Sequence, residues 1–431
     1  MTSSNAAYVY KLAELCKSIQ DGNWIETKDQ SSEGYRLLQI GNIAVGKFRE
    51  SGKPRYVSED TFRRLNCTKI EMGDVLIARM PDPTGRAWCV DAPIPDSITS
   101  VDVAIVRVDP AKLDAKYLAY FLNQKSTLQL MASLQTGSTR QRIKRSDLCT
   151  LEILTHQLGT QKAIAQFFTN LDHKIALNEI ISKTLEDIAQ TIFKSWFIDF
   201  DPVKAKMAGE KPAGMDAATA ALFPEAMEDS ELGLIPTGWK VHSLDEISEY
   251  LNGLAMQKFP VIDESEQLPV IKIAQLRAGN TQRADMASGL LDSRYIINDG
   301  DILFSWSGTL EVETWAGGPG ALNQHLFKVT GKNVPDWYSY VSTKSFLSFF
   351  RGVASGKATT MGHIQRSHLS ESKLAIPNLE LLNRATEIIE PLISLKIKTS
   401  IESRNLAEIR DSLLPRLISG ELQIPEEMLA S

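Results

Sequence analysis

Two long stretches of the chain place apolar residues at alternating steps of three and four, the spacing of one face of a helix. They run from Gln161 to Trp196 and from Leu381 to Leu417, and neither contains glycine. At 1.5 Å per residue, ~36 residues form a helix ~55 Å long. A lone helix would leave its apolar face in water, so we expect the two helices to pack on each other along their coiled-coil seams. The first stripe is Ile164, Phe168, Leu171, Ile175, Leu185, Ala189, Ile192 and Trp196, interrupted by Asn178 and Ser182; the second is Ile388, Leu392, Leu395, Leu406, Ile409, Leu413 and Leu417, interrupted by Thr399 and Glu402.

Elsewhere the pattern changes to short apolar runs bounded by Gly and Asp, which is typical of strands between turns. Strands are expected at residues 75–77, 103–106 and 301–304, and short helices at Lys116–Asn123 and Trp337–Phe350. The globular parts of the chain therefore belong to the α+β class.

Segments of the first half of the chain recur in the second half in the same order, separated each time by between 221 and 233 residues. A period of this length is far too long for a solenoid and indicates two homologous domains. The predicted fold is α+β: two similar globular domains separated by two long helices that form a coiled coil, with a pseudo-twofold internal repeat. The matching pairs are 9–15 with 241–247, 39–43 with 272–276, 73–77 with 300–304, 106–108 with 327–329, and 143–148 with 364–369.

These patterns divide the chain into six parts. The globular domains cover 1–156 and 237–378, the long helices 157–200 and 379–422, and a tail follows at 423–431. Between the first helix and the second domain, residues 201–236 contain prolines, alanines and an acidic run. We expect this linker to have little fixed structure.

The composition is that of a globular protein: 431 residues, 43% hydrophobic, with a net charge of −6. The acidity lies mainly in the linker and the two long helical stretches, whereas the first domain is mildly basic and compatible with DNA binding. We expect no transmembrane helix and no secretory signal, and hence a cytoplasmic protein with reduced thiols. The cysteines are scattered singly: Cys16, Cys67, Cys89 and Cys149.

Several longer motifs resemble those of type I restriction–modification specificity subunits, the HsdS family. The segment from Phe193 to Val203, Phe-Lys-Ser-Trp-Phe-Ile-Asp-Phe-Asp-Pro-Val, resembles the family's central conserved region together with residues 171–178 before it. Residues 233–240 resemble the entry to its second recognition domain, and 413–422 its C-terminal conserved region. The resemblance covers the whole chain in the right order.

The resemblance implies two target recognition domains that each read half of a split double-stranded DNA site and are separated by an antiparallel pair of long helices. It also implies a chain without catalytic activity of its own, which joins two methyltransferase (M) subunits and two restriction (R) subunits. No cofactor is then bound by this chain, since S-adenosylmethionine, ATP and Mg²⁺ belong to the partner subunits.

The densest basic cluster lies after a glycine in the first domain and suits a loop that grips phosphates. The alternative is a solvated helix start with incidental charge. Its repeat counterpart, residues 355–363, is again a loop rich in Gly and Thr. The predicted DNA-binding residues are Arg140, Arg142, Lys144 and Arg145 in the first loop and Lys357, Thr359, Thr360 and His363 in the second.

For reading bases, arginine side chains pair well with guanine. Arg79 and Arg86 flank a turn at 81–85 in the first domain and are our candidates there. The matching place in the second domain holds Ser305, Trp306, Ser307 and Thr309. In both cases the alternative is a surface turn without a partner.

Phe193, Trp196, Phe197 and Phe200 form a large aromatic group at the end of the first long helix. It is interpreted either as a core plug, where the helix meets a domain, or as a docking surface for the M subunit.

Two other classes of function are less compatible with the sequence. A DNA-acting enzyme is disfavoured because the chain lacks an N-P-P-Y tetrapeptide and a complete P-loop. A nuclease-like P-D…E-x-K motif is present at Pro335-Asp336 and Glu371-Ser-Lys373, but this pattern is short and degenerate. A purely structural coiled-coil adaptor would explain the helices but not two duplicated globular domains.

Overall fold

The computed structural model describes residues 7–137, 139–356, 362–425 and 427. The described residues form two compact units: those within 1–173 and 407–431 make up unit 1, and those within 174–406 make up unit 2. Each long helix therefore contributes one portion to each unit. Among the described residues, no helix is long and apolar enough to cross a membrane.

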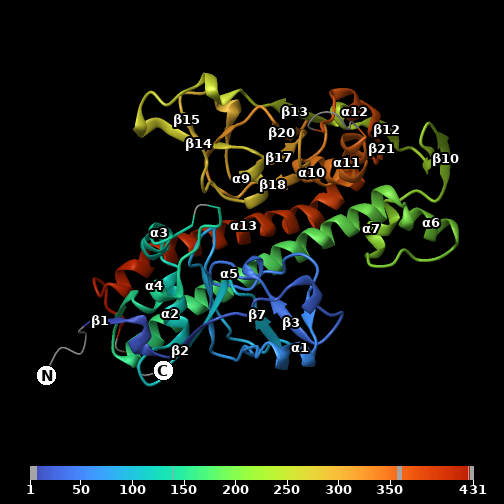
Figure 1. Ribbon diagram of the computed structural model, residues 1–431. Helices are drawn as coiled ribbons and strands as arrows, with labels where there is room; N and C mark the ends of the chain where they lie inside the picture. Colours follow the sequence, from blue (N-terminus) through green and yellow to red (C-terminus); the bar gives the residue numbers. More distant parts are fainter. Residues whose placement is uncertain (1–6, 138, 357–361, 426, 428–431) are drawn as a thin grey trace. The chain divides into compact units, whose positions relative to one another are not determined.

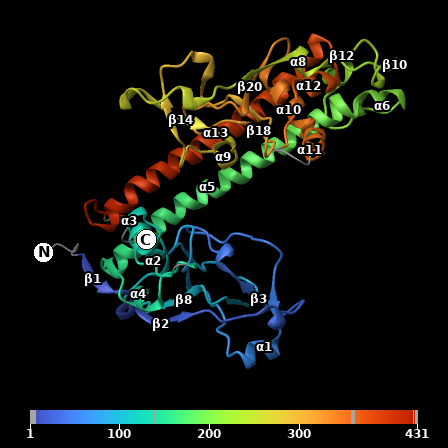
Figure 2. The ribbon, with the colours of Figure 1, turned by 45° about the horizontal axis from the view of Figure 1, so that its top comes forward.

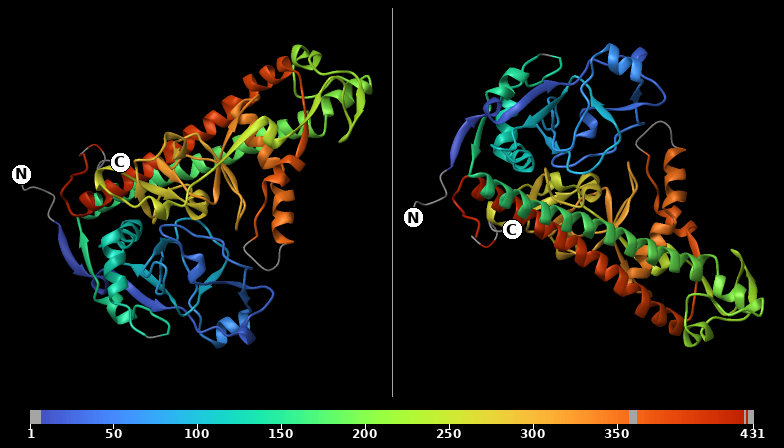
Figure 3. Two further views of the ribbon diagram at one scale, coloured as in Figure 1. Left: turned by 90° about the horizontal axis from the view of Figure 1, so that it is seen from above. Right: turned by 90° about the horizontal axis from the view of Figure 1, so that it is seen from below.

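The two predicted long helices are present. Helix α5 covers Leu158–Phe193 and α13 covers Leu379–Ile418, and the two lie side by side (green and red in Figures 1 and 3). In unit 1, Arg410 of α13 binds Asp172 of α5 at 2.8 Å. In unit 2, the amide of Asn178 donates to Glu402 at 2.9 Å. Since the partner number falls as the α5 number rises, the helices are antiparallel.

The buried face of α13 differs from the predicted stripe. Leu395 and Ile409 were placed in the seam, yet they are 46% and 45% exposed, whereas Ile389, Ile393 and Lys396 are buried. In unit 2, α13 packs against both α5 and the globular domain, so its buried face is wider than a coiled-coil seam and centred elsewhere.

Unit 1 contains a four-stranded sheet of order β2-β8-β5-β6, a three-stranded sheet β4-β3-β7 and a strand pair β1-β9. Asp114 caps the N-terminus of helix α2, because its carboxylate accepts from the Tyr117 N–H at 2.9 Å. The strands are β1 (Tyr8–Lys11), β2 (Cys16–Asp21), β3 (Tyr35–Leu38), β4 (Tyr56–Val57), β5 (Val75–Ala78), β6 (Ala87–Cys89), β7 (Ser97–Thr99), β8 (Val103–Val108) and β9 (Glu152–Thr155); the short helices are α1 (Glu59–Arg64), α2 (Ala115–Leu122), α3 (Lys125–Ser133) and α4 (Arg145–Cys149).

Unit 2 repeats this plan with sheets of order β13-β20-β17-β18 and β15-β14-β19-β16 and a strand pair β12-β21. Helix α10 packs on β18 and β20 of the first sheet (Figure 2). The strands are β12 (Lys240–Ser243), β13 (Ser248–Asn252), β14 (Gln267–Ile271), β15 (Met286–Ser288), β16 (Ile296–Ile297), β17 (Ile302–Ser305), β18 (Val312–Thr314), β19 (Gly320–Leu322), β20 (Leu326–Gly331) and β21 (Lys373–Ile376); the helices are α8 (Leu244–Ile247), α9 (Ile273–Ala278), α10 (Asp336–Ser345), α11 (Leu347–Ser355) and α12 (Arg366–Glu371).

The strand pairings match between the two units. The predicted repeat equates β5 with β17 and β8 with β20. In unit 1, β5 and β8 are antiparallel neighbours in the four-stranded sheet, and in unit 2 β17 and β20 are paired in the same way. In the second sheets, β3 pairs with β7 in parallel, as β14 pairs with β19. The duplication seen in short sequence matches thus extends to strand order and direction.

The segment 201–236, expected to have little fixed structure, is folded within unit 2. It forms α6 (Asp201–Met207), α7 (Ala217–Ala221) and the hairpin β10–β11 (Met227–Ser230 and Gly233–Pro236). Val203, Phe223 and Ile235 are buried in the main core of the unit. These apolar anchors order a segment whose proline and acidic content is typical of a linker.

Candidate nucleic-acid interface

In unit 1 the structure brings together the two loops that hold the predicted DNA-binding residues. The turn after β5 and the loop before α4 are joined by a backbone hydrogen bond from the Ile143 N–H to the Arg79 carbonyl, 3.0 Å long. Unit 2 repeats the contact: the Ile364 N–H donates to the Trp306 carbonyl at 3.0 Å, and the Gly308 N–H donates to the Gly362 carbonyl at 2.8 Å. The same pair of loops therefore meets in both units.

The basic loop of unit 1 carries exposed positive charge. Arg140, Lys144 and Arg145 are exposed, and none of the three forms an ion pair within the described ranges. Arg142 is half-buried, and its guanidinium lies 3.2 Å from Asp102. Three cations without a carboxylate partner can bind an anionic backbone without first losing an internal contact.

Arg79 does not lie on the surface, as its predicted role in base reading requires. Its side chain is 6% exposed and donates from Nε to the Ile143 carbonyl at 3.0 Å. Its guanidinium also binds Asp21 of β2. Arg79 thus fixes the basic loop to the four-stranded sheet, and a direct contact with a base is disfavoured.

Arg86 is buried as well, at 5% exposure. Its guanidinium donates to four backbone carbonyls: Ile43 at 2.5 Å, Ile40 at 2.7 Å, Pro83 at 2.7 Å and Met80 at 3.0 Å. Burial lowers the pKa of this guanidinium from its usual value. The five donors of arginine suit this arrangement, which closes the turn after β5, so the geometry favours a structural role over base reading.

The candidate residues of unit 2 differ in their exposure. Ser305 is buried and donates to the Thr309 carbonyl at 2.7 Å, whereas the Thr309 side chain is exposed. Ser307 is buried, with its hydroxyl 3.0 Å from Nδ1 of His325. The half-buried Trp306 ring lies 6.4 Å from the His363 ring. Lys357, Thr359 and Thr360 lie outside the described residues.

Sequence reasoning missed two polar residues at this place. Asn252 accepts from Trp306 Nε1 at 2.9 Å, and His325 holds Ser307. Asn252 is the last residue of β13 and His325 directly precedes β20, so neither is adjacent to 305–309 in the sequence. A local pattern carries no signal for them.

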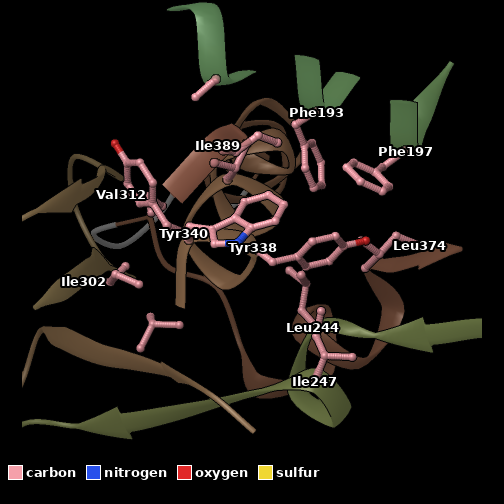
Figure 4. Packing of buried hydrophobic residues seen from close by; sticks show 14 of the residues in the cluster. Phe193, Phe197, Leu244, Ile247, Ile302, Val312, Tyr338, Tyr340, Leu374 and Ile389 are labelled. Atoms are coloured by element: carbon pink, nitrogen blue, oxygen red, sulfur yellow. The ribbon is translucent and has the colours of Figure 1, made fainter. Parts of the chain in front are cut away.

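The aromatic group at the end of α5 belongs to the core of unit 2. Phe193, Trp196 and Phe197 are 1%, 6% and 1% exposed, and only Phe200 is half-buried. Figure 4 shows the Phe193 and Phe197 rings near Tyr338, with ring centroids 5.2 and 5.5 Å from it. The geometry favours the core plug over a docking surface.

Two charged residues of the nuclease-like motif, Asp336 and Lys373, have structural partners. The Asp336 carboxylate accepts from the Gly331 N–H at 2.7 Å at the start of α10. Lys373 pairs with Glu231 at 2.6 Å. Within the described part of the chain, no three His, Cys, Asp or Glu side chains are grouped to hold a metal ion.

Comparison with known proteins agrees with the duplicated fold. A family model described as the type I restriction modification DNA specificity domain matches residues 7–187 and 236–410. The HindI specificity subunit of Haemophilus influenzae is 25% identical over 406 residues, covering 82% of this chain and 87% of its own length. The MjaIX specificity subunit of Methanocaldococcus jannaschii is 26% identical over 421 residues, covering 94% and 87%.

A solved structure shares the fold. The S subunit of the type I restriction–modification system from M. genitalium matches with a TM-score of 0.53 and 15% identity, over 97% of each chain. The family model spans most of the sequence and covers both halves of the repeat, a feature that a coiled-coil adaptor does not explain. The chain therefore belongs to the type I restriction–modification DNA specificity family, and it is the non-catalytic DNA specificity subunit of such a system.

Proposed function

We propose that residues 1–156 and 237–378 are target recognition domains that each read one half of a bipartite DNA site. The observation that carries the proposal is the loop pair built twice, after β5 and after β17, in domains of the same topology. A duplicated reading surface fits a target with two separate half-sites.

The long helices, 157–200 and 379–422, are proposed to set the spacer between the half-sites. Half-sites one turn apart on B-DNA are separated by about 34–36 Å. Helix α5 has 36 residues, and at 1.5 Å per residue it is about 54 Å long. A helix pair of fixed length can maintain a separation of this order.

Arg140, Arg142, Lys144 and Arg145 are proposed to hold phosphates in the first domain, with Lys357, Thr359, Thr360 and His363 in the corresponding loop of the second. Among the proposed base-reading residues, Trp306 and Thr309 are the accessible ones, since Arg79, Arg86, Ser305 and Ser307 are buried. In this proposal, contacts to bases are made by the solvent-exposed side chains of the two loop pairs.

The chain is proposed to assemble with two M and two R subunits on double-stranded DNA. S-adenosylmethionine, ATP and Mg²⁺ are proposed to bind to those subunits. Membership of the specificity family, whose role is to choose the DNA target, supports this division of labour.

Mapping of methylated adenines after co-expression with the cognate M subunit tests the proposed function. We expect methylation at two half-sites separated by a fixed number of unspecified base pairs. A continuous target would contradict the division between two domains. Methylation without sequence preference would favour the adaptor alternative, and turnover by the purified chain alone would favour the enzyme alternative.

A variant of the basic loop gives a more local prediction. Replacing Arg140, Lys144 and Arg145 together by alanine is expected to weaken binding to every DNA sequence. At ~0.9 per phosphate contact, the slope of log K against log salt concentration should become shallower by ~2.7. Titration of labelled target and non-target duplexes at several salt concentrations measures both effects.

The matched control is Lys28→Ala with Arg63→Ala, which removes two exposed cations that already have carboxylate partners. We expect a slope close to that of the wild type. Loss of affinity for the target alone, with non-target binding unchanged, would identify the loop arginines as base readers.

A further inference from the structure

A tyrosine hydroxyl joins the globular domain of unit 1 to both long helices. Tyr120 of α2 donates to Asp172 of α5 at 2.7 Å. The other oxygen of the same carboxylate accepts from Arg410 of α13 at 2.8 Å. One carboxylate thus fastens a helix of the domain and both members of the helix pair.

Unit 2 contains a cluster that joins the same kinds of group, a tyrosine hydroxyl, a carboxylate and a cation. The Tyr340 hydroxyl of α10 binds Glu186 of α5 and accepts from Lys396 of α13 at 2.7 Å. Lys344, one turn further along α10, binds Glu186 as well, and it donates to Glu313 of β18 at 2.8 Å. Here too a carboxylate on α5, a cation on α13 and a tyrosine of the domain meet.

The two clusters are not copies made by the repeat. The repeat equates Tyr117 with Tyr338, since α2 and α10 begin 221 residues apart. Tyr120 is three residues beyond the first of these and Tyr340 two residues beyond the second. The same three-way contact is therefore built twice from different positions, which points to a requirement common to both domains.

The groups of the second cluster are withdrawn from water. The side chains of Lys396, Glu186 and Lys344 are 8%, 14% and 16% exposed. Burial alone would raise the pKa of Glu186, but the ammonium groups of Lys396 and Lys344 hold it below its usual value. The charges are thus kept in a place where apolar side chains would pack at least as stably.

Directional contacts supply what apolar packing does not. An apolar domain–helix contact can be repacked at small cost, whereas a buried charged hydrogen bond is lost when its donor and acceptor move apart. A domain held in this way keeps one orientation on its helices.

We propose that the Tyr120–Asp172–Arg410 and Tyr340–Glu186–Lys396 clusters fix the orientation of each recognition domain on the helix pair. They thereby determine which spacer length between the two half-sites the protein recognises. The inference rests on the proposed function, in which the domains read separate half-sites. These are positioning residues: they act on the DNA through the placement of the domains, and they do not touch bases.

Tyr120→Phe and Tyr340→Phe test the proposal, because each removes one hydroxyl and leaves the carboxylate and the cation in place. Matched controls are Tyr117→Phe and Tyr250→Phe. Their hydroxyls lie within the domains, 2.8 Å from the Leu154 carbonyl and 2.7 Å from Thr343 Oγ1. Each pair thus compares the loss of a hydrogen-bonded hydroxyl at the helix contact with the same loss inside the domain.

The full chain in complex with its M subunit is assayed for methylation rate on duplexes with the two half-sites held constant and the spacer lengthened or shortened by one base pair. For Tyr120→Phe we expect discrimination between the correct and altered spacers to fall about tenfold, equivalent to ~1.4 kcal/mol, with unchanged preference within each half-site. Tyr340→Phe should have a smaller effect, since Lys344 still joins α10 to Glu186. The controls should discriminate as the wild type does.

Unchanged spacer discrimination in both cluster variants, or an equal loss in the controls, would overturn the inference while leaving the proposed function intact. A wild-type complex indifferent to the spacer would overturn the proposed function, and this inference with it.

Discussion

Arg86→Met is expected to destabilise unit 1 by roughly 4 kcal/mol, because four backbone carbonyls lose their donor. An unpaired buried carbonyl costs about 1–3 kcal/mol, and the lower end applies here because three of the four bonds are only partly buried. Methionine fills much of the arginine volume, so the loss reports on the hydrogen bonds more than on packing. Hydrogen exchange of the full chain, followed in the peptides that contain β5 and β6, measures the change locally. We expect the backbone amides of these strands to exchange faster, because the local unfolding that exposes them costs less free energy.

Two further variants sharpen this experiment. Arg86→Lys retains the charge but cannot reach four carbonyls from one ammonium group, so it should lose most of the same stability. Arg63→Met, at an exposed position on α1, should change stability by less than ~0.5 kcal/mol. If Arg86→Met kept its protection and lost only the recognition of one half-site, the sequence-based interpretation of Arg86 as a base reader would be correct.

The long helices could be predicted because their signal is local. A stripe at steps of three and four over many turns is the periodicity of a helix and of no strand or turn, and α5 and α13 lie where it placed them. The choice of buried side chains was less local. Lys396 interrupts the apolar face of α13 and is nevertheless buried, because Glu186 and Tyr340 of other elements meet it there.

The sequence located the two loops of the candidate site but not the burial of the side chains in them. The short repeats located the loops after β5 and before α4, and the structure brings these loops together. Near a Gly- and Pro-rich turn, however, an arginine that contacts DNA and one that binds carbonyls look alike in the sequence. For Arg86 the structural role becomes visible in the fold, where residues 40–43, distant in the sequence, place two backbone carbonyls beside its guanidinium.

The segment 201–236 shows the opposite limitation. Its proline and acidic residues predicted a linker, since such compositions bury little apolar surface. Three apolar side chains, Val203, Phe223 and Ile235, are nevertheless buried in the core of unit 2 and anchor the segment there. Composition averages over a segment, whereas folding depends on where its few apolar residues meet a partner surface.

Phe197→Ala is expected to lower the free energy of unfolding of unit 2 by about 3–5 kcal/mol, the usual cost of emptying a buried phenylalanine site. The ring packs on Phe193, Trp239 and Tyr338, with centroids 5.3, 5.9 and 5.5 Å away, so neighbours on α5 and in the domain lose a shared contact. Urea unfolding followed by tryptophan fluorescence measures the change, since Trp196, Trp239 and Trp337 belong to the same core.

Ile198→Ala is the matched control, because this neighbouring side chain is 38% exposed and should cost much less. The two variants also separate the two interpretations of the aromatic group. A core plug predicts that Phe197→Ala loses stability in the isolated chain, before any partner is present. A docking surface predicts a stable chain that no longer co-purifies with the M subunit, and that result would contradict the core assignment.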